Sequence, residues 1–168
     1  MTVKPLPQRT PWTVLRENAL QIVMHLLGTV LVGLVWWPLG LVYLTYSLAS
    51  NVMYMAWICP YCGRYALATC AAGFDLLSGR RFKPQPGRTF GGEFRRRSWE
   101  LYPDWFVPPV AAVYLLVTAF SWPVLALGVV FCLDAFWLLP EASKKHCENC
   151  ETVDCPRFPR DRQPAVKS

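Results

Sequence analysis

Two long stretches of the sequence are nearly free of charged residues. Residues 18–63 contain no Lys, Arg, Asp or Glu, and residues 105–140 contain only Asp134. A helix needs about 20 apolar residues to cross the hydrocarbon core of a bilayer, so the first stretch has room for two crossings and the second for two short ones. Surface helices of soluble proteins are apolar on one face only, whereas these stretches are apolar all round. The pattern predicts insertion into a membrane.

Each apolar stretch contains one natural break. The breaks are Trp-Pro pairs at residues 37–38 and 122–123. Proline lacks a backbone N–H and disfavours helix in the residue before it, so each pair predicts the tip of a helical hairpin. Pro108 and Pro109 are expected in the first turn of the third helix, where a missing N–H leaves no helical bond unmade. The expected transmembrane helices cover residues 18–37, 39–58, 105–122 and 124–139.

The predicted fold class is an all-α integral membrane protein with four transmembrane helices arranged as two hairpins. A re-entrant second hairpin is the alternative, because its helices are short. The expected segments are an N-terminal cytoplasmic arm (1–17), the first hairpin (18–58), a cytoplasmic loop rich in cysteine and basic residues (59–104), the second hairpin (105–140) and a cytoplasmic cysteine-rich tail (141–168).

The basic residues predict the orientation of the hairpins. The chain is 54% hydrophobic, yet it carries 17 Lys and Arg and a formal net charge of +6. These residues lie in the arm, the loop and the tail, and neither hairpin tip contains one. Segments rich in Lys and Arg remain on the cytoplasmic side of a membrane. We therefore expect a multi-pass protein of the cytoplasmic membrane with both termini in the cytoplasm.

Six of the seven cysteines lie just beyond the second and fourth expected helices. They are Cys59, Cys62, Cys70, Cys147, Cys150 and Cys155. Because the cytosol is reducing, cysteines at such spacing more often bind metal or carry out thiol chemistry than form structural disulfides. Two C-x-x-C pairs supply the four thiolates of a tetrahedral metal site. The preferred ligands are Cys59, Cys62, Cys147 and Cys150, with Cys70 and Cys155 as substitutes or additional ligands.

The cysteine spacing slightly favours Zn²⁺ over an iron–sulfur cluster. A proline follows Cys155, as in a ferredoxin cysteine run, but the closely spaced third cysteine of that run is missing. Reduced, inert or redox-active thiols are the remaining alternative. A metal that bridges the hairpins would act as a clamp, because its binding free energy is lost when the hairpins separate. Helices in lipid have little hydrophobic drive to associate without such a contact.

Three polar residues within the expected helices lie at a similar depth, and they form a candidate cluster. They are His25, Asn51 and Asp134. A charged side chain inside a transmembrane helix is costly and usually faces a partner. The functional interpretation is a proton relay, a quinone headgroup site or a haem ligand. The structural interpretation, which we favour, is an interhelical hydrogen bond that locks the bundle. Cys132 is taken as a small apolar packing residue.

The loop over residues 79–99 mixes basic residues with phenylalanines and includes the run Arg95-Arg96-Arg97. Its prolines and glycines at 84–92 are expected to prevent a long helix. Such mixtures occur on surfaces that bind nucleic acid. Beside transmembrane helices they favour anionic lipid headgroups, at about 1 kcal/mol per basic residue. We therefore expect anionic lipid headgroups as partners, together with a protein partner in a membrane complex, and no nucleic acid.

No nucleophile–base pair, phosphate-binding glycine loop or metal-hydrolase motif is visible, so catalysis is not indicated. We expect a cytoplasmic-membrane accessory, assembly or scaffold protein whose two hairpins are clamped by a cysteine-bound metal. The alternative is an iron–sulfur redox subunit of a membrane electron-transfer complex. In that subunit, His25, Asn51 and Asp134 would handle a quinone or a proton.

Overall fold

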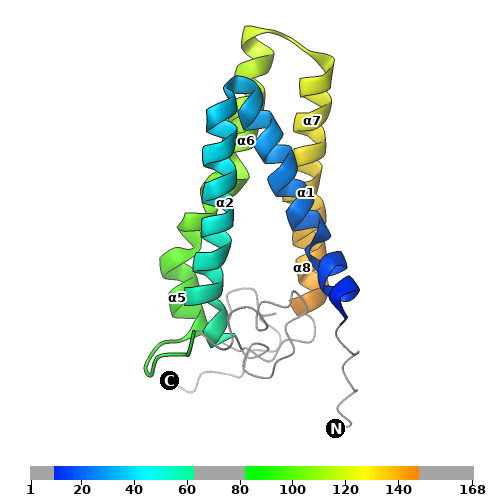
Figure 1. The fold of residues 1–168 in the computed structure, drawn as a ribbon. Coiled ribbons are helices and arrows are strands. Elements are labelled where there is room, and N and C mark those ends of the chain that lie inside the picture. The colour runs from blue at the N-terminus through cyan, green and yellow to red at the C-terminus, as the bar shows by residue number, and fades with distance from the viewer. Residues whose placement is uncertain (1–9, 63–81, 148–168) are drawn as a thin grey trace, which may run out of the picture.

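The computed structural model describes residues 10–62 and 82–147, and these residues form helices with no β-strand (Figure 1). The first part holds α1 (Pro11–Val35), α2 (Trp37–Trp57) and the short 3-10 helix η1 (Cys59–Tyr61). The second part holds α5 (Phe90–Arg97), the 3-10 turn η2 (Ser98–Leu101), α6 (Tyr102–Thr118), α7 (Trp122–Leu133), the π-helical turn η3 (Asp134–Leu138) and α8 (Leu139–Cys147). The all-α prediction is confirmed for the described residues.

The long helices form two antiparallel pairs. Trp36 alone separates α1 from α2, and residues 119–121 separate α6 from α7. Figure 1 shows both connections at one end of the molecule, with α5, α8, the start of α1 and the end of α2 toward the other end. α1 contacts α2, α6 and α7. The first helix therefore joins the two pairs into one bundle.

Both apolar stretches are interrupted close to the Trp-Pro pairs, but the interruption comes just before each pair. Trp37 and Trp122 are the first residues of α2 and α7, so Pro38 and Pro123 fall in the first turns of these helices. The first turn has N–H groups without helical partners, and proline is tolerated there at no cost in hydrogen bonds. The prolines thus begin the second helix of each pair.

Three helical stretches are long and apolar enough to cross a membrane. They are Val14–Val35, Phe90–Thr118 and Trp122–Lys144, with 22, 29 and 23 residues. The last two are longer than the sequence predicts for the second hairpin. α2 is not among the three, and its tyrosine, serine and asparagine residues lower its mean hydropathy. The structure therefore gives a membrane protein with three candidate spans.

The helix expected over residues 105–122 begins earlier, because α5 and η2 lead directly into α6. The expectation that the prolines and glycines at 84–92 prevent a long helix is wrong for Gly91 and Gly92, which lie in the continuous helical stretch Phe90–Thr118. The Thr89 hydroxyl accepts a hydrogen bond from the Gly92 N–H at 3.3 Å, which caps the first turn of α5. Glu93 lies near the start of α5 and three arginines lie in its last turn, so both ends suit the helix dipole. The Thr89 cap and the charges at the two ends offset the low helix propensity of Gly91 and Gly92.

The helix expected to end at residue 139 continues through Pro140 to Cys147. The π-helical turn η3 ends two residues before this proline, and the Leu139 N–H donates to the Asp134 carbonyl five residues back. A proline inside a regular α-helix lacks one N–H and presses its ring against the carbonyl four residues earlier. The wider π turn moves that carbonyl away and lets the helix continue.

Glycines allow α1 and α2 to approach closely beside their connection. A Cβ atom on Gly40 would lie 2.9 Å from the Gly33 Cα and 3.0 Å from the Thr29 carbonyl oxygen. One turn further from the connection, a Cβ atom on Gly28 would lie within 2.8 Å of the Tyr43 ring. Small residues at such positions allow helices to pack closely in a membrane.

Gly40→Ala should destabilise the fold by about 2 kcal/mol, because the new methyl group meets backbone atoms that cannot move without separating the helices. The measurement is thermal unfolding in detergent micelles followed by circular dichroism. Gly33→Ala is the matched control, since its Cβ atom would have an ordinary contact of 3.7 Å with Gly40. Equal effects of the two substitutions would contradict the close approach at Gly40.

Candidate functional site

Several polar side chains of the bundle are buried, although many of its apolar side chains are exposed. Ser47, Ser50 and Asp104 are at most 3% exposed, whereas Leu48 and Val52 on the same α2 helix are 60% and 55% exposed. A soluble protein shows the opposite distribution. In hydrocarbon, a polar group must find its hydrogen bonds inside the protein, so buried polar contacts are the candidate functional centre.

Asp104 is the centre of the main polar contact between α2 and α6. Its Oδ1 accepts a hydrogen bond from the Ser47 hydroxyl at 2.7 Å, and its Oδ2 accepts one from the Ser50 hydroxyl at 2.6 Å. Asp104 lies in the first turn of α6, where the helix dipole favours a negative charge. The carboxylate is therefore held by both serines and by the helix end.

Tyr43 completes this contact by bonding the backbone of Asp104. Pro108 lies inside α6 and has no N–H to donate to the Asp104 carbonyl four residues earlier. The Tyr43 hydroxyl donates to that carbonyl at 2.9 Å. The expectation that Pro108 and Pro109 lie in the first turn is wrong, because α6 begins at Tyr102. The α2 tyrosine takes the place of the missing donor.

A second polar network joins α1 to α2 and contains two members of the predicted cluster. The Asn51 amide nitrogen donates to His25 Nε2 at 3.1 Å and to the Ser47 carbonyl at 2.8 Å, and its Oδ1 accepts from Gln21 Nε2 at 2.6 Å. His25 Nδ1 faces the Gln21 carbonyl, so it carries the proton and Nε2 accepts. Both N–H groups of the Asn51 amide are thus used, and its oxygen accepts one hydrogen bond.

Asp134, the third member of the predicted cluster, lies apart from this network. It is 3% exposed, and neither carboxyl oxygen has a hydrogen-bond partner among the described residues. Its neighbours in the chain, Phe131 and Ala135, belong to the apolar core together with Met24 and Leu31 of α1. The structure brings His25 and Asn51 together but does not bring Asp134 into hydrogen-bonding contact with them.

Sequence reasoning missed the contact at Asp104, although a signal was present. On α2, Tyr43, Ser47 and Ser50 follow at intervals of four and three residues, which is the spacing of one helix face. A polar stripe on an otherwise apolar helix indicates a polar partner on a neighbouring helix. Asp104 was assigned to the loop because the boundary of the second hairpin was placed immediately after it.

The first C-x-x-C pair lies at the end of α2. Cys59 is buried, Cys62 is half-buried, and the Cys62 N–H donates to the Cys59 carbonyl at 3.0 Å in a tight turn. Cys147 is the last residue of α8, and α2 and α8 end toward the same end of the bundle (Figure 1). The described residues contain no group of three or more potential metal ligands. Cys70, Cys150 and Cys155 lie outside the described residues.

Part of the basic segment is neutralised within the protein. Arg97 pairs with the buried Glu93 at 3.3 Å and with Glu100 at 3.5 Å, and its guanidinium lies 3.8 Å from the centre of the Trp57 ring. These contacts dock α5 against the end of α2. Arg95 and Arg96 are exposed and form no ion pair with any described carboxylate. They are the two cations of the run that remain open to a partner.

No known family, curated protein or solved structure matched the chain in comparisons of each kind.

Replacing both Ser47 and Ser50 with alanine should lower the free energy of unfolding by about 2 kcal/mol, because the buried Asp104 carboxylate loses both hydroxyl donors. The measurement is denaturant unfolding of the protein in micelles. Thr45→Ala is the control, since Thr45 is exposed on the same helix and its hydroxyl bonds only the Leu41 carbonyl of its own helix. A loss no larger than that of Thr45→Ala would count against the contact.

The two buried aspartates should respond in opposite directions to the same substitution. Asp134→Leu should stabilise the fold by about 2 kcal/mol, because it removes a buried carboxyl group with no partner. Asp104→Leu should destabilise it by a similar amount, because two buried serines lose their acceptor. Unfolding midpoints of both variants in the same micelles provide the comparison. Destabilisation by Asp134→Leu would reveal a partner for that carboxyl group outside the described residues.

Proposed function

We propose that the chain is a multi-pass scaffold or accessory protein of the cytoplasmic membrane, with two helical hairpins clamped by a cysteine-bound metal, for which zinc is favoured. The supporting observation is the inward placement of polar side chains in a bundle whose outer surface is apolar. The proposal comprises four crossings, a cytoplasmic location of the cysteines and a structural role for the metal. Each part has separate support.

Four crossings are supported by the connection between α1 and α2. Trp36 alone joins these antiparallel helices, so a chain that crosses the membrane in α1 must return in α2. The polar side chains of α2 that lower its hydropathy include Tyr43, Ser47 and Asn51, and all three form hydrogen bonds with other helices or with the helix backbone. The α2 helix therefore presents a largely apolar surface to lipid.

Tryptophans at both ends of the bundle support the same placement. Trp36, Trp37 and Trp122 lie at the helix connections, and Trp12, Trp57, Trp99 and Trp137 lie toward the opposite end. Tryptophan is enriched at both membrane interfaces. The 20 residues from Trp37 to Trp57 correspond to about 30 Å of helix, which is the thickness of the hydrocarbon core.

The cytoplasmic orientation is supported by the position of the basic residues. Arg16 near the start of α1, the arginines of α5 and Lys144 of α8 all lie in segments away from the helix connections (Figure 1). The cysteines at the ends of α2 and α8 lie toward the same end. By the positive-inside rule, this end faces the cytoplasm, where cysteines remain reduced and available to a metal.

A structural role is favoured over a redox role by the way the polar groups are used. Both oxygens of the Asp104 carboxylate are bonded to α2, and the Asn51 amide is bonded to Gln21 and His25 of α1 and to the Ser47 carbonyl of its own helix. A quinone headgroup would have to break these bonds to be held there. Hydrogen bonds between helices of this kind lock the helices together. The metal would add a clamp at the opposite end from the helix connections.

Metal content tests this function. The full chain, purified anaerobically in detergent, should be colourless and contain bound zinc. Cys62→Ser and Cys150→Ser should each lose most of the zinc and lower the unfolding temperature, because a metal site adds its binding free energy to the fold. Cys132→Ser is the control. Cys132 lies within the bundle, away from the proposed ligands, so this variant should keep its zinc. Zinc is measured by elemental analysis and helicity by circular dichroism.

The same measurement separates the alternatives. A brown protein with iron and sulfide would support the iron–sulfur redox subunit in place of the scaffold. A protein without either metal, with all cysteines freely alkylated, would overturn the clamp.

A further inference from the structure

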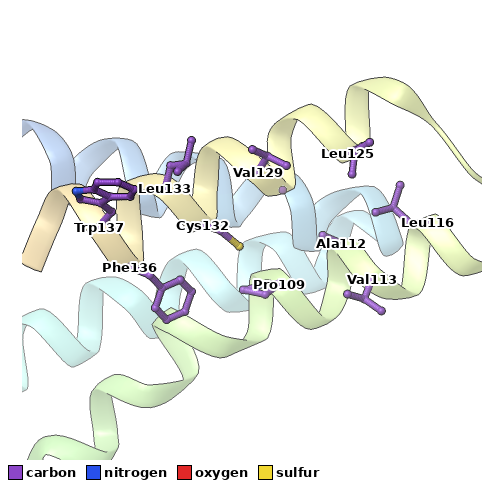
Figure 2. Close-up of a pocket in the computed structure, with 11 residues that line it drawn as sticks. Pro109, Ala112, Val113, Leu116, Leu125, Val129, Cys132, Leu133, Phe136 and Trp137 are labelled. Atoms are coloured by element: carbon purple, nitrogen blue, oxygen red, sulfur yellow. The ribbon is translucent and has the colours of Figure 1, made fainter.

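An apolar groove of about 450 Å³ lies between α6 and α7 (Figure 2). Its α6 side includes Pro109 and Val113, and its α7 side includes Val129 and Cys132. Figure 2 shows the Cys132 thiol pointing toward α6 between the two helices. Apart from Cys132 and Trp137 at one end, every residue that lines the groove is purely apolar. A polar ligand would therefore find few partners here, whereas a hydrocarbon chain would find apolar contacts.

The groove has a closely packed floor. A Cβ atom on Gly128 would lie 3.2 Å from the Ala112 Cβ atom, so the two helices meet closely at this point. Val113 and Leu133 form parts of the groove walls and are themselves about half exposed. The groove is therefore open on the outer surface of the bundle. The groove is a fixed feature of helix packing rather than a gap between loosely associated helices.

Aromatic side chains extend the groove along the outer face of α6. Phe136, at one end of the groove in Figure 2, lies 5.9 Å from the Phe106 ring and 5.7 Å from the Trp105 ring, measured between centroids. Phe106 lies 6.2 Å from the Tyr102 ring. Phe106 and Tyr102 are more than half exposed. They form a continuous apolar track from the groove to the start of α6.

This track leads to Arg95 and Arg96, which form no ion pair with a described carboxylate, although the Arg95 Nε donates to the Gly91 carbonyl of its own helix at 3.3 Å. Arg95, Trp99, Tyr102 and Phe106 follow at intervals of four, three and four residues, which keeps them on one side of the helical segment, and all four are exposed. Along this side the surface changes from cationic to aromatic to apolar. Arg96 adds a second exposed cation beside Arg95. Such a gradient matches an amphiphile with an anionic head and an apolar tail.

We propose that this surface binds one anionic phospholipid, with its phosphate at Arg95 and Arg96 and one acyl chain in the groove between α6 and α7. The inference rests on the membrane placement in the proposed function. It identifies a lipid class for the end of the bundle that carries the arginines of α5. The 14 residues from Arg95 to Pro109 span about 21 Å. One leaflet with its headgroups is about 20–22 Å thick. An extended acyl chain of a lipid held at the arginines therefore reaches the end of the groove nearest α5, at Pro109 and Phe136.

The arginines select the lipid, and the groove fixes its position. The apolar contacts alone give little selectivity, because bulk lipid tails are as apolar as the groove. The headgroup contacts distinguish a negatively charged phospholipid from a zwitterionic one. A transmembrane helix of a partner would need acidic residues at the level of Arg95 to use the same gradient. A phospholipid has its phosphate in the headgroup region, which is the level of Arg95.

Native mass spectrometry of the full chain tests the site. The protein is exchanged into micelles containing phosphatidylglycerol or phosphatidylcholine, and the lipid retained per chain is counted. We expect one retained phosphatidylglycerol and no comparable retention of phosphatidylcholine. The double variant Arg95→Gln, Arg96→Gln should lower retention about thirtyfold. Arg16→Gln is the control, because Arg16 is exposed at the start of α1 and pairs with Glu17.

A second pair of variants tests the groove without changing charge. Val129→Trp should fill the groove and reduce retention. Val130→Trp, one residue along and also about half exposed, does not line the groove and should leave retention unchanged. Circular dichroism confirms that both variants are folded. Equal retention of the two phospholipids, or equal effects of the two tryptophans, would mean annular lipid only and overturn the site.

The outcomes are separable from those of the proposed function. If the protein retained lipid selectively but contained no metal, only the proposal of a metal clamp would be rejected. If the protein bound zinc but did not retain one phospholipid selectively, only the proposal of the lipid site would be rejected. A chain that purifies monodisperse without detergent would remove the membrane placement and, with it, both proposals.

Discussion

The carboxylate of Asp104, held between the hydroxyls of Ser47 and Ser50, is the buried polar contact that fixes α2 against α6 in a bundle whose two helix pairs are joined by α1. Helices surrounded by lipid gain little from hydrophobic association, so specific polar bonds and close packing must place them. This contact ties α2 of the first pair to the start of α6 in the second. It thereby places the end of α2, the docked α5 segment and the first cysteines relative to the remaining helices.

The same contact makes the unusual composition of α6 possible. Two prolines inside a helix leave carbonyl groups without donors, and a bare carbonyl in hydrocarbon is costly. At Asp104 the backbone carbonyl receives the Tyr43 hydroxyl while the side chain receives the serines. One residue of α6 is therefore bonded through both its backbone and its side chain to one face of α2. The tyrosine and the proline are best understood as a matched pair.

α1 packs against α2 in one way and against α6 and α7 in another. Toward α2 it presents glycines near the connection and then the longer polar side chains of His25 and Gln21. Figure 1 shows α1 and α2 diverging away from their connection, and the bridging side chains become longer in the same direction. Toward α6 and α7 it presents Met24 and Leu31, which pack in an apolar core. One helix thus combines polar bridging with close apolar packing.

The sequence predicted the features that depend on local chemistry. The absence of charge predicted the apolar helices, proline predicted the breaks, and depth along the helices predicted the meeting of His25 with Asn51. The continuation of the last helix through Pro140 was not predictable, because it depends on a π turn that no local residue preference signals. The Asp104 contact was missed because burial of a residue at a predicted boundary is decided by the neighbouring helix. Depth alone does not fix the direction of a side chain, and for this reason Asp134 lies apart.

The close approach of Gly33 and Gly40 makes the connection between α1 and α2 a pivot. The remainder of α2 beyond Gly40 is about 25 Å long, so a tilt of about 5° at the glycines moves its far end by about 2 Å. Metal–ligand distances vary by only about 0.2 Å. In the proposed metal clamp, the close packing of these small side chains would therefore govern whether sulfur atoms at the opposite end of the protein can share an ion.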